Sequence, residues 1–103
     1  MFARVTTTQG QVTKQDAARV VRDRVPPGAK AIPGFKGGLW LIDEKGGKGL
    51  TITLFDSEEA LRASAEAAER LRAGAVGELG VSTTSVESYE VIVAAGVAEP
   101  ITA

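Results

Sequence analysis

The stretch of residues 34–61 restricts the fold of this chain more than any other part of the sequence. It contains two apolar runs, 39–42 and 50–55, joined by the charged, glycine-rich segment 43–48. Two apolar runs separated in this way are typical of a β-hairpin. Residues 56–59 then supply a capping side chain and a Glu three residues later, which predicts the start of a helix. The stretch therefore predicts strand, hairpin, strand and helix in direct succession.

A first strand is predicted over residues 2–8, because this segment is rich in β-branched residues and is followed by Gly10. Arg4 is the only charged residue within it. Two interpretations of Arg4 stay open. In the first, the aliphatic part of the side chain packs against apolar residues while the guanidinium reaches solvent or a carboxylate. In the second, the guanidinium contacts an anion in a pocket.

Two helices are predicted from the spacing of the apolar residues. The first covers residues 14–25 and is expected to end at 26–28, since the two prolines there lack backbone donors. The second runs from Ser57 to about Ala73, carries an alanine-rich stripe and is expected to end at Gly74 and Gly77.

The last strand is predicted after Gly80 and is best defined over residues 85–93. Residues 94–103 show no periodicity and are either a frayed tail or an arm that lies on a partner. Residues 1–93 are expected to form one α+β barrel domain. The order β-α-β-β-α-β predicts an α+β, ferredoxin-like sandwich with a four-stranded antiparallel sheet.

Both faces of the hairpin strands are apolar, which bears on assembly. Leu39 and Leu41 lie on one face of the first strand, and Trp40 and Ile42 lie on the other. The second run, 50–55, ends with apolar residues on both faces. Strands of this kind are covered on both sides. Because helices on one side of a sheet leave the other side wet, we expect a second subunit to cover it, giving a homodimer.

Composition excludes several classes of function. The chain has no cysteine and no histidine, so it has no thiolate site, Ser-His-Asp triad, His-ligated zinc or histidine haem ligand. A net charge of −1 provides no field to hold a phosphate backbone, so nucleic acid is not an expected partner. No run approaches the roughly 20 apolar residues of a membrane span. We therefore expect a cytoplasmic protein that uses neither metal nor membrane.

Residues 33–35, 38–43 and 49–61 resemble the antibiotic biosynthesis monooxygenase-like family of dimeric α+β barrels. The most specific motif is the aromatic-x-Ser-x-Glu-Ala-Leu stretch at Phe55–Leu61. The resemblance implies two sheets packed face to face and a cavity between each sheet and its own helices. Some members oxygenate aromatic polyketide-like substrates without metal or flavin, so no cofactor is expected, and others oxidise quinols or cleave haem. The missing histidine, and Phe55 where the haem-degrading branch usually carries tryptophan, argue against haem cleavage.

Oxygenation without a cofactor needs an ionisable substrate, a dry pocket and hydrogen-bond donors near the developing oxyanion. Such a pocket would take a small aromatic ligand. The candidate lining residues, which would supply its aromatic walls and hydrogen-bond donors, are Arg4, Phe35, Trp40, Thr51, Thr53, Phe55 and Tyr89. None of them is assigned a catalytic role. The aromatic members would alternatively be core or interface residues. The protein would then be a non-catalytic dimeric ligand-binding or accessory domain, or an oligomerisation module whose sheet–helix space is filled.

Overall fold

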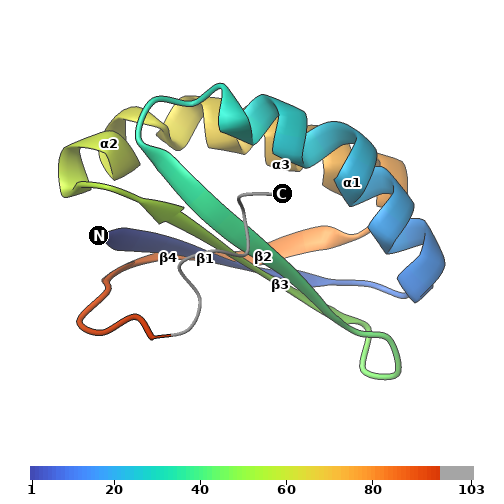
Figure 1. The fold of residues 1–103 in the computed structure, drawn as a ribbon. Helices are drawn as coiled ribbons and strands as arrows, with labels where there is room; N and C mark the ends of the chain where they lie inside the picture. The colour runs from blue at the N-terminus through green and yellow to red at the C-terminus, as the bar shows by residue number, and fades with distance from the viewer. Residues whose placement is uncertain (96–103) are drawn as a thin grey trace.

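The fold is known from a computed structural model, which describes residues 1–95. One sheet of four strands carries three helices on one of its faces (Figure 1). The elements in chain order are β1 Phe2–Gln9, α1 Lys14–Lys30, β2 Phe35–Asp43, β3 Lys48–Phe55, α2 Glu58–Ala63, α3 Ala65–Leu79 and β4 Ser82–Glu90. The predicted ferredoxin-like order is confirmed, with the second helix divided into α2 and α3.

The strands are arranged β2-β3-β1-β4 and every neighbouring pair is antiparallel. The register places Val5 opposite Ile52, and Ile52 opposite Leu39. Thr6 faces Thr51 in the same way, and Thr51 faces Trp40. Because side chains alternate along a strand, these two rows lie on opposite faces of the sheet.

Helix α1 extends beyond the end that was predicted from its two prolines. It is capped by Thr13, whose Oγ1 accepts from the backbone N–H of Asp16 at 3.1 Å, and it continues through Pro26 and Pro27 to Lys30. The prolines remove two intrahelical donors, but the carbonyls that lose them belong to exposed positions that water can reach. Beyond the prolines Ala29 is buried, so packing of the last turn offsets the missing bonds.

The second helical segment is also longer than predicted, and it is interrupted at Ser64. The residue that caps α2 is Ser57, with its Oγ 3.0 Å from the backbone nitrogen of Ala60, and not Asp56, which is the residue with a Glu three positions later. The predicted end at Gly74 and Gly77 is wrong, since α3 continues to Leu79. Gly80, with φ of 72°, is the residue that adopts the left-handed conformation that ends the helix.

Strand β4 begins three residues before the predicted Ser85 and ends at Glu90 rather than Val93. Its length follows from its partner, because β1 pairs from Phe2 opposite Glu90 to Gln9 opposite Ser82. Of the predicted tail or arm at 94–103, residues 96–103 lie outside the described part of the chain.

The two faces of the sheet have different surroundings. The face toward the helices, called the inner face below, contributes Phe55, which belongs to the buried core as Val20, Leu61 and Ala75 of the helices do. The opposite, outer face leaves Leu39 and Leu41 exposed at 41% and 47%. The second apolar face predicted from the sequence is therefore present and has no covering element among residues 1–95.

Candidate functional site

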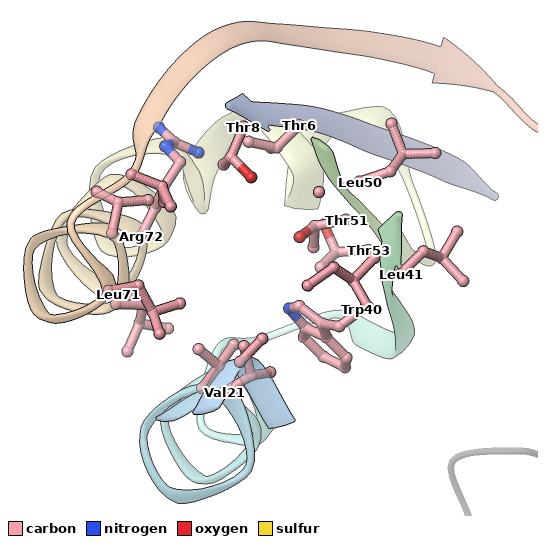
Figure 2. A pocket seen from close by; sticks show the side chains of 18 of the residues that line it. Thr6, Thr8, Val21, Trp40, Leu41, Leu50, Thr51, Thr53, Leu71 and Arg72 are labelled. Carbon is pink, nitrogen blue, oxygen red and sulfur yellow. The ribbon is translucent and has the colours of Figure 1, made fainter. Parts of the chain in front are cut away.

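A cavity of about 580 Å³ lies between the inner face of the sheet and the helices α1 and α3 (Figure 2). Its volume falls within the range of roughly 300–1,000 Å³ that small-molecule sites occupy. Figure 2 shows Leu41 and Leu50 pointing away from this space, although their backbones border it. Side-chain alternation along β2 and β3 therefore decides which residues face the cavity.

Threonines dominate the sheet wall of the cavity. Thr6 and Thr8 come from β1, and Thr51 and Thr53 come from β3. All four point into the cavity in Figure 2, and Thr6 and Thr51 are direct cross-strand partners. Within residues 1–95 none of their hydroxyls has a protein hydrogen-bond partner. The sheet wall therefore offers a row of free hydroxyl groups.

Trp40 of β2 lies beside this row, and two glycines make room for the side chains. A Cβ on Gly38 would come within 2.7 Å of Cη2 of Trp40, so the indole ring lies along the strand over this glycine. A Cβ on Gly49 would come within 2.5 Å of Thr8 Oγ1. Figure 2 shows the nitrogen-bearing edge of the indole turned toward the cavity. Trp40 therefore adds an N–H donor to the hydroxyl row.

The helix wall is apolar. Val21 of α1 and Leu71 of α3 face the threonines across the cavity (Figure 2). A Cβ on Gly28 would come within 2.5 Å of Leu71 Cδ2, so this glycine lets α1 and α3 approach closely. A ligand between these walls would place an apolar face on the helices and polar atoms on the sheet.

Arg4 is buried at the Phe55 end of the cavity, with 7% of its surface exposed. Its Nη2 donates to the carbonyl of Leu61 at 2.8 Å, and its guanidinium carbon lies 5.3 Å from the centre of the Phe55 ring. Burial, and secondarily the positive charge of Arg72, lower the pKa of Arg4 below its ordinary value. Nη1 is buried and has no hydrogen-bond partner among the described residues.

The contact of Arg4 with Leu61 also accounts for the interruption between α2 and α3. In an unbroken helix the carbonyl of Leu61 would accept from the N–H of Ala65. This carbonyl instead accepts from Arg4 Nη2 and from Ser64 Oγ at 2.7 Å. Side chains inserted into the ladder are a known cause of helix breaks. Arg4 thus connects the sheet wall to the junction of the two helices.

Phe35 and Phe55 form the aromatic end of the lining. Their ring centroids are 6.0 Å apart with an interplanar angle of 75°, an edge-to-face contact. Phe55 is only 1% exposed, so it is a core residue whose surface also borders the cavity.

Six of the seven candidate residues from the sequence border this cavity: Arg4, Phe35, Trp40, Thr51, Thr53 and Phe55. Tyr89 does not. It pairs with Ala3 on the outer face and is 51% exposed, so it cannot converge with Arg4. The nearby carboxylate of Glu87 raises the pKa of Tyr89. Side chains alternate along β4, but the face on which Tyr89 lies could be assigned only from the register of β4 with β1.

Sequence reasoning did not select Thr6, Thr8, Leu71 or Arg72, which also line the cavity. Thr6 and Thr8 share the alternation of Arg4 along β1, so that signal was available in the sequence. Leu71 and Arg72 lie on the apolar stripe of the second helix, but their placement depends on how α3 packs over the sheet.

Among residues 1–95 no group of three or more acidic side chains is arranged to hold a metal ion. Within the same range, no helix combines the length and apolar character needed to cross a bilayer.

No protein-family model matches this sequence, and no curated protein matches it. Solved structures do resemble it. One is described as a "putative Antibiotic biosynthesis monooxygenase" from Chloroflexus aurantiacus J-10-fl, with a TM-score of 0.62 and 16% identity over 93% of this chain and 97% of that chain. Another, with the same description, is from Deinococcus radiodurans, with a TM-score of 0.58 and 18% identity over 94% and 98%. The chain therefore has the ferredoxin-like fold of antibiotic biosynthesis monooxygenase-like proteins.

Proposed function

We propose that this protein is a monooxygenase-like enzyme that oxidises small aromatic substrates, of the polyketide or quinol type, in the sheet–helix cavity without a metal or flavin. The observation that carries the proposal is the cavity of about 580 Å³ with an apolar helix wall and a sheet wall of free hydroxyls. The two solved structures described as monooxygenases share the fold and so are consistent with this assignment.

For a polyketide-type substrate, the reaction balances with oxygen as the only co-substrate. A methylene group that is activated by flanking aromatic rings and a carbonyl group loses a proton. The resulting enolate then passes electrons to O₂. The carbon becomes a ketone that keeps one oxygen atom, and the second oxygen leaves as water. The substrate therefore supplies all four electrons.

In this scheme the protein holds the substrate and stabilises its negative oxygen. Donors for that oxygen are available from the Arg4 guanidinium, the Thr53 hydroxyl and the indole N–H of Trp40. Preorganised donors in a site that excludes water are the largest common source of such stabilisation. Val21 and Leu71 would pack against the rings of the substrate and exclude water.

A second function is favoured by one specific feature, the absence of an obvious proton acceptor. The chain has no histidine, and no carboxylate among the described residues lines the cavity. A non-catalytic dimeric domain that captures a small aromatic ligand would need no such group. An oligomerisation module with a filled interior is disfavoured by the volume of the cavity.

We further propose that the protein forms a homodimer through the outer face of the sheet. Leu39, Leu41 and Tyr89 are large side chains that this face leaves exposed. Exposed apolar patches of this kind mark association sites. Light scattering at micromolar concentration would give twice the monomer mass, and the monomer mass would contradict the proposal.

Oxygen consumption tests the proposed activity. Purified protein is given a panel of anthrones and hydroquinones, and uptake above the rate of spontaneous oxidation is measured with an electrode. Arg4→Met should lower the rate on the order of 10²-fold if Arg4 donates to the oxyanion. Arg70→Gln is the control, because Arg70 is 70% exposed and pairs with Glu66 away from the cavity. Tight binding of these compounds without oxygen uptake would favour the binding domain instead.

A further inference from the structure

The side chains around the cavity carry charge of only one sign. Five basic residues line it, Arg4, Lys14, Arg22, Lys48 and Arg72, and no acidic residue among the described part of the chain does so. The whole chain has thirteen acidic and twelve basic residues. The one-sided lining is therefore a local property of the cavity.

Acidic side chains elsewhere pair with arginines that do not line the cavity. Glu78 pairs with Arg19 and Arg24, at 3.8 and 2.5 Å, on the outside of the α1–α3 contact. Glu58 and Glu66 pair with Arg62 and Arg70 at 3.2 Å each. Across residues 1–95 no carboxylate lies within 4.0 Å of the guanidinium nitrogens of Arg4 or Arg72.

Arg4 is the strongest indication that a negative group is missing. It is more than nine-tenths buried, and its Nη1 lacks a partner. A buried cation is costly unless it is paired, and leaving one of its donors unused adds to that cost. The nearby charge of Arg72 increases the cost, as the lowered pKa of Arg4 indicates.

A purely structural role does not account for this arrangement. The carbonyl of Leu61 that Arg4 contacts already accepts from Ser64 Oγ, so it would remain satisfied without Arg4. The stacking on Phe55 does not require Nη1. Neither contact explains why a second arginine lies close by on α3.

We propose that the cavity selects an organic anion whose charged oxygen atoms are held between Arg4 and Arg72, while its apolar body lies between the threonines and the helix wall. Guanidinium groups bind carboxylates and other anionic oxygens through short, charge-assisted hydrogen bonds. Arg72 is half-buried on α3, lines the same cavity as Arg4 and is near enough for its charge to act on Arg4. The ligand is a carboxylate, or an enol or phenol bound in its ionised form.

This inference rests on the proposed function, because it assigns the charge of the ligand that the same cavity takes. It also addresses the missing proton acceptor. A substrate that enters as an ionised enol or phenol has already lost the proton, and the two arginines stabilise that ionised form.

Matched naphthalene probes test the inference. The full-length protein is titrated with 2-naphthoate and with its neutral counterpart 2-naphthamide, and affinities are measured by calorimetry. Binding is located by the indole N–H signal in ¹H–¹⁵N spectra, because Trp40 is the only tryptophan. We expect the affinity for 2-naphthoate to exceed that for 2-naphthamide by about tenfold or more, because only the carboxylate forms a charge-assisted pair. A third probe, 2-naphthol, measured below and above the pKa of its hydroxyl, distinguishes a carboxylate from an ionised phenol as the preferred anion.

Two variants assign the preference to the arginines. Arg72→Gln removes the charge with little change of volume and should abolish most of the preference for 2-naphthoate, leaving the affinity for 2-naphthamide unchanged. Arg70→Gln removes an arginine two residues away on the same helix, outside the cavity, and should leave both affinities unchanged. Circular dichroism confirms that both variants fold.

The outcomes separate the two proposals. Equal binding of the two probes at the Trp40 site overturns the anion inference and leaves the ligand cavity intact. A preference for 2-naphthoate that survives Arg72→Gln, or that is lost equally in Arg70→Gln, also overturns it. If neither probe shifts the Trp40 signal, the cavity is not an aromatic ligand site and the proposed function fails together with the inference.

Discussion

The two faces of the sheet are built from alternate residues of the same strands, yet they reverse the usual distribution of polarity. The inner face, turned toward the helices, presents Thr6, Thr51 and Thr53. The outer face, which no described element covers, presents Ile52 and Leu41. In an ordinary helix-covered sheet the apolar residues face the helices. The reversal supports the two proposals that the inner face is a ligand site and the outer face a dimer interface.

The reversal is not complete, and the exception shows what holds the fold together. At the end where β1, β2 and β3 meet α2, the inner face turns apolar with Phe35 and Phe55. Phe55 is 1% exposed, so the helices are anchored to the sheet there. The cavity then opens along the threonine row. The aromatic end of the inner face thus anchors the helices, while the threonine row borders the open part of the cavity.

The largest expected effect on stability comes from removing that anchor. Phe55→Ala should lower the free energy of unfolding by about 3–5 kcal/mol, because it deletes a buried ring and leaves a void. Leu41→Ala, on the exposed outer face, should cost well under half of that. Urea denaturation followed by circular dichroism measures both. Equal losses would mean that the two faces do not differ as described.

A charge on the outer face should break the proposed dimer. Leu41→Glu places a carboxylate in the apolar patch, and we expect the dimer dissociation constant to rise on the order of 100-fold. Thr51→Glu, on the inner face of the neighbouring strand, is the matched comparison and should leave the dimer intact. Sedimentation at several concentrations measures the constant. A dimer unaffected by Leu41→Glu would place the interface elsewhere.

Arg4 should contribute to ligand binding without contributing much to folding. Arg4→Met removes a buried cation that has no counter-charge among the described residues, while Ser64 still satisfies the Leu61 carbonyl. We expect the free energy of unfolding to change by no more than about 1 kcal/mol, since the lost hydrogen bond and the relieved burial of charge offset each other. The affinity for 2-naphthoate should fall to about that for 2-naphthamide. A loss of several kcal/mol in stability would make Arg4 a structural residue.

The smallest effect concerns the titration of Tyr89 on the outer face. The carboxylate of Glu87 disfavours the tyrosinate and so raises the pKa of Tyr89. Removing that charge with Glu87→Gln should lower the pKa toward its ordinary value, because the tyrosinate no longer faces a negative neighbour. Ultraviolet absorbance of this single tyrosine follows the titration. An unchanged pKa would show that Glu87 and Tyr89 do not interact across the face.

Much of the fold could be predicted from local patterns. The hairpin and the order of elements depend on nearby residues, and they are confirmed. The helix ends were wrong, because tertiary packing of Ala29 overrides the two prolines. Residues Gly74 and Gly77 remain helical because Gly80 ends α3.

The candidate site could be predicted only in part, for a reason that lies in the register. Alternation along each strand is readable, and it places Trp40, Thr51 and Thr53 on consistent faces. Which face the helices cover is a property of the assembled sheet. Tyr89 is therefore among the candidate lining residues although it lies on the outer face, and Arg72 is not among them because its position depends on the packing of α3.

One measurement tests the division between the two faces directly, because the chain carries one tryptophan and one tyrosine. Trp40 borders the cavity and Tyr89 lies on the outer face. Titration with 2-naphthoate, followed by nuclear magnetic resonance, should shift the Trp40 indole signal and leave the Tyr89 ring signals in place. Shifts at Tyr89 with an unmoved Trp40 would contradict the account, since they would put the ligand on the face assigned to the interface.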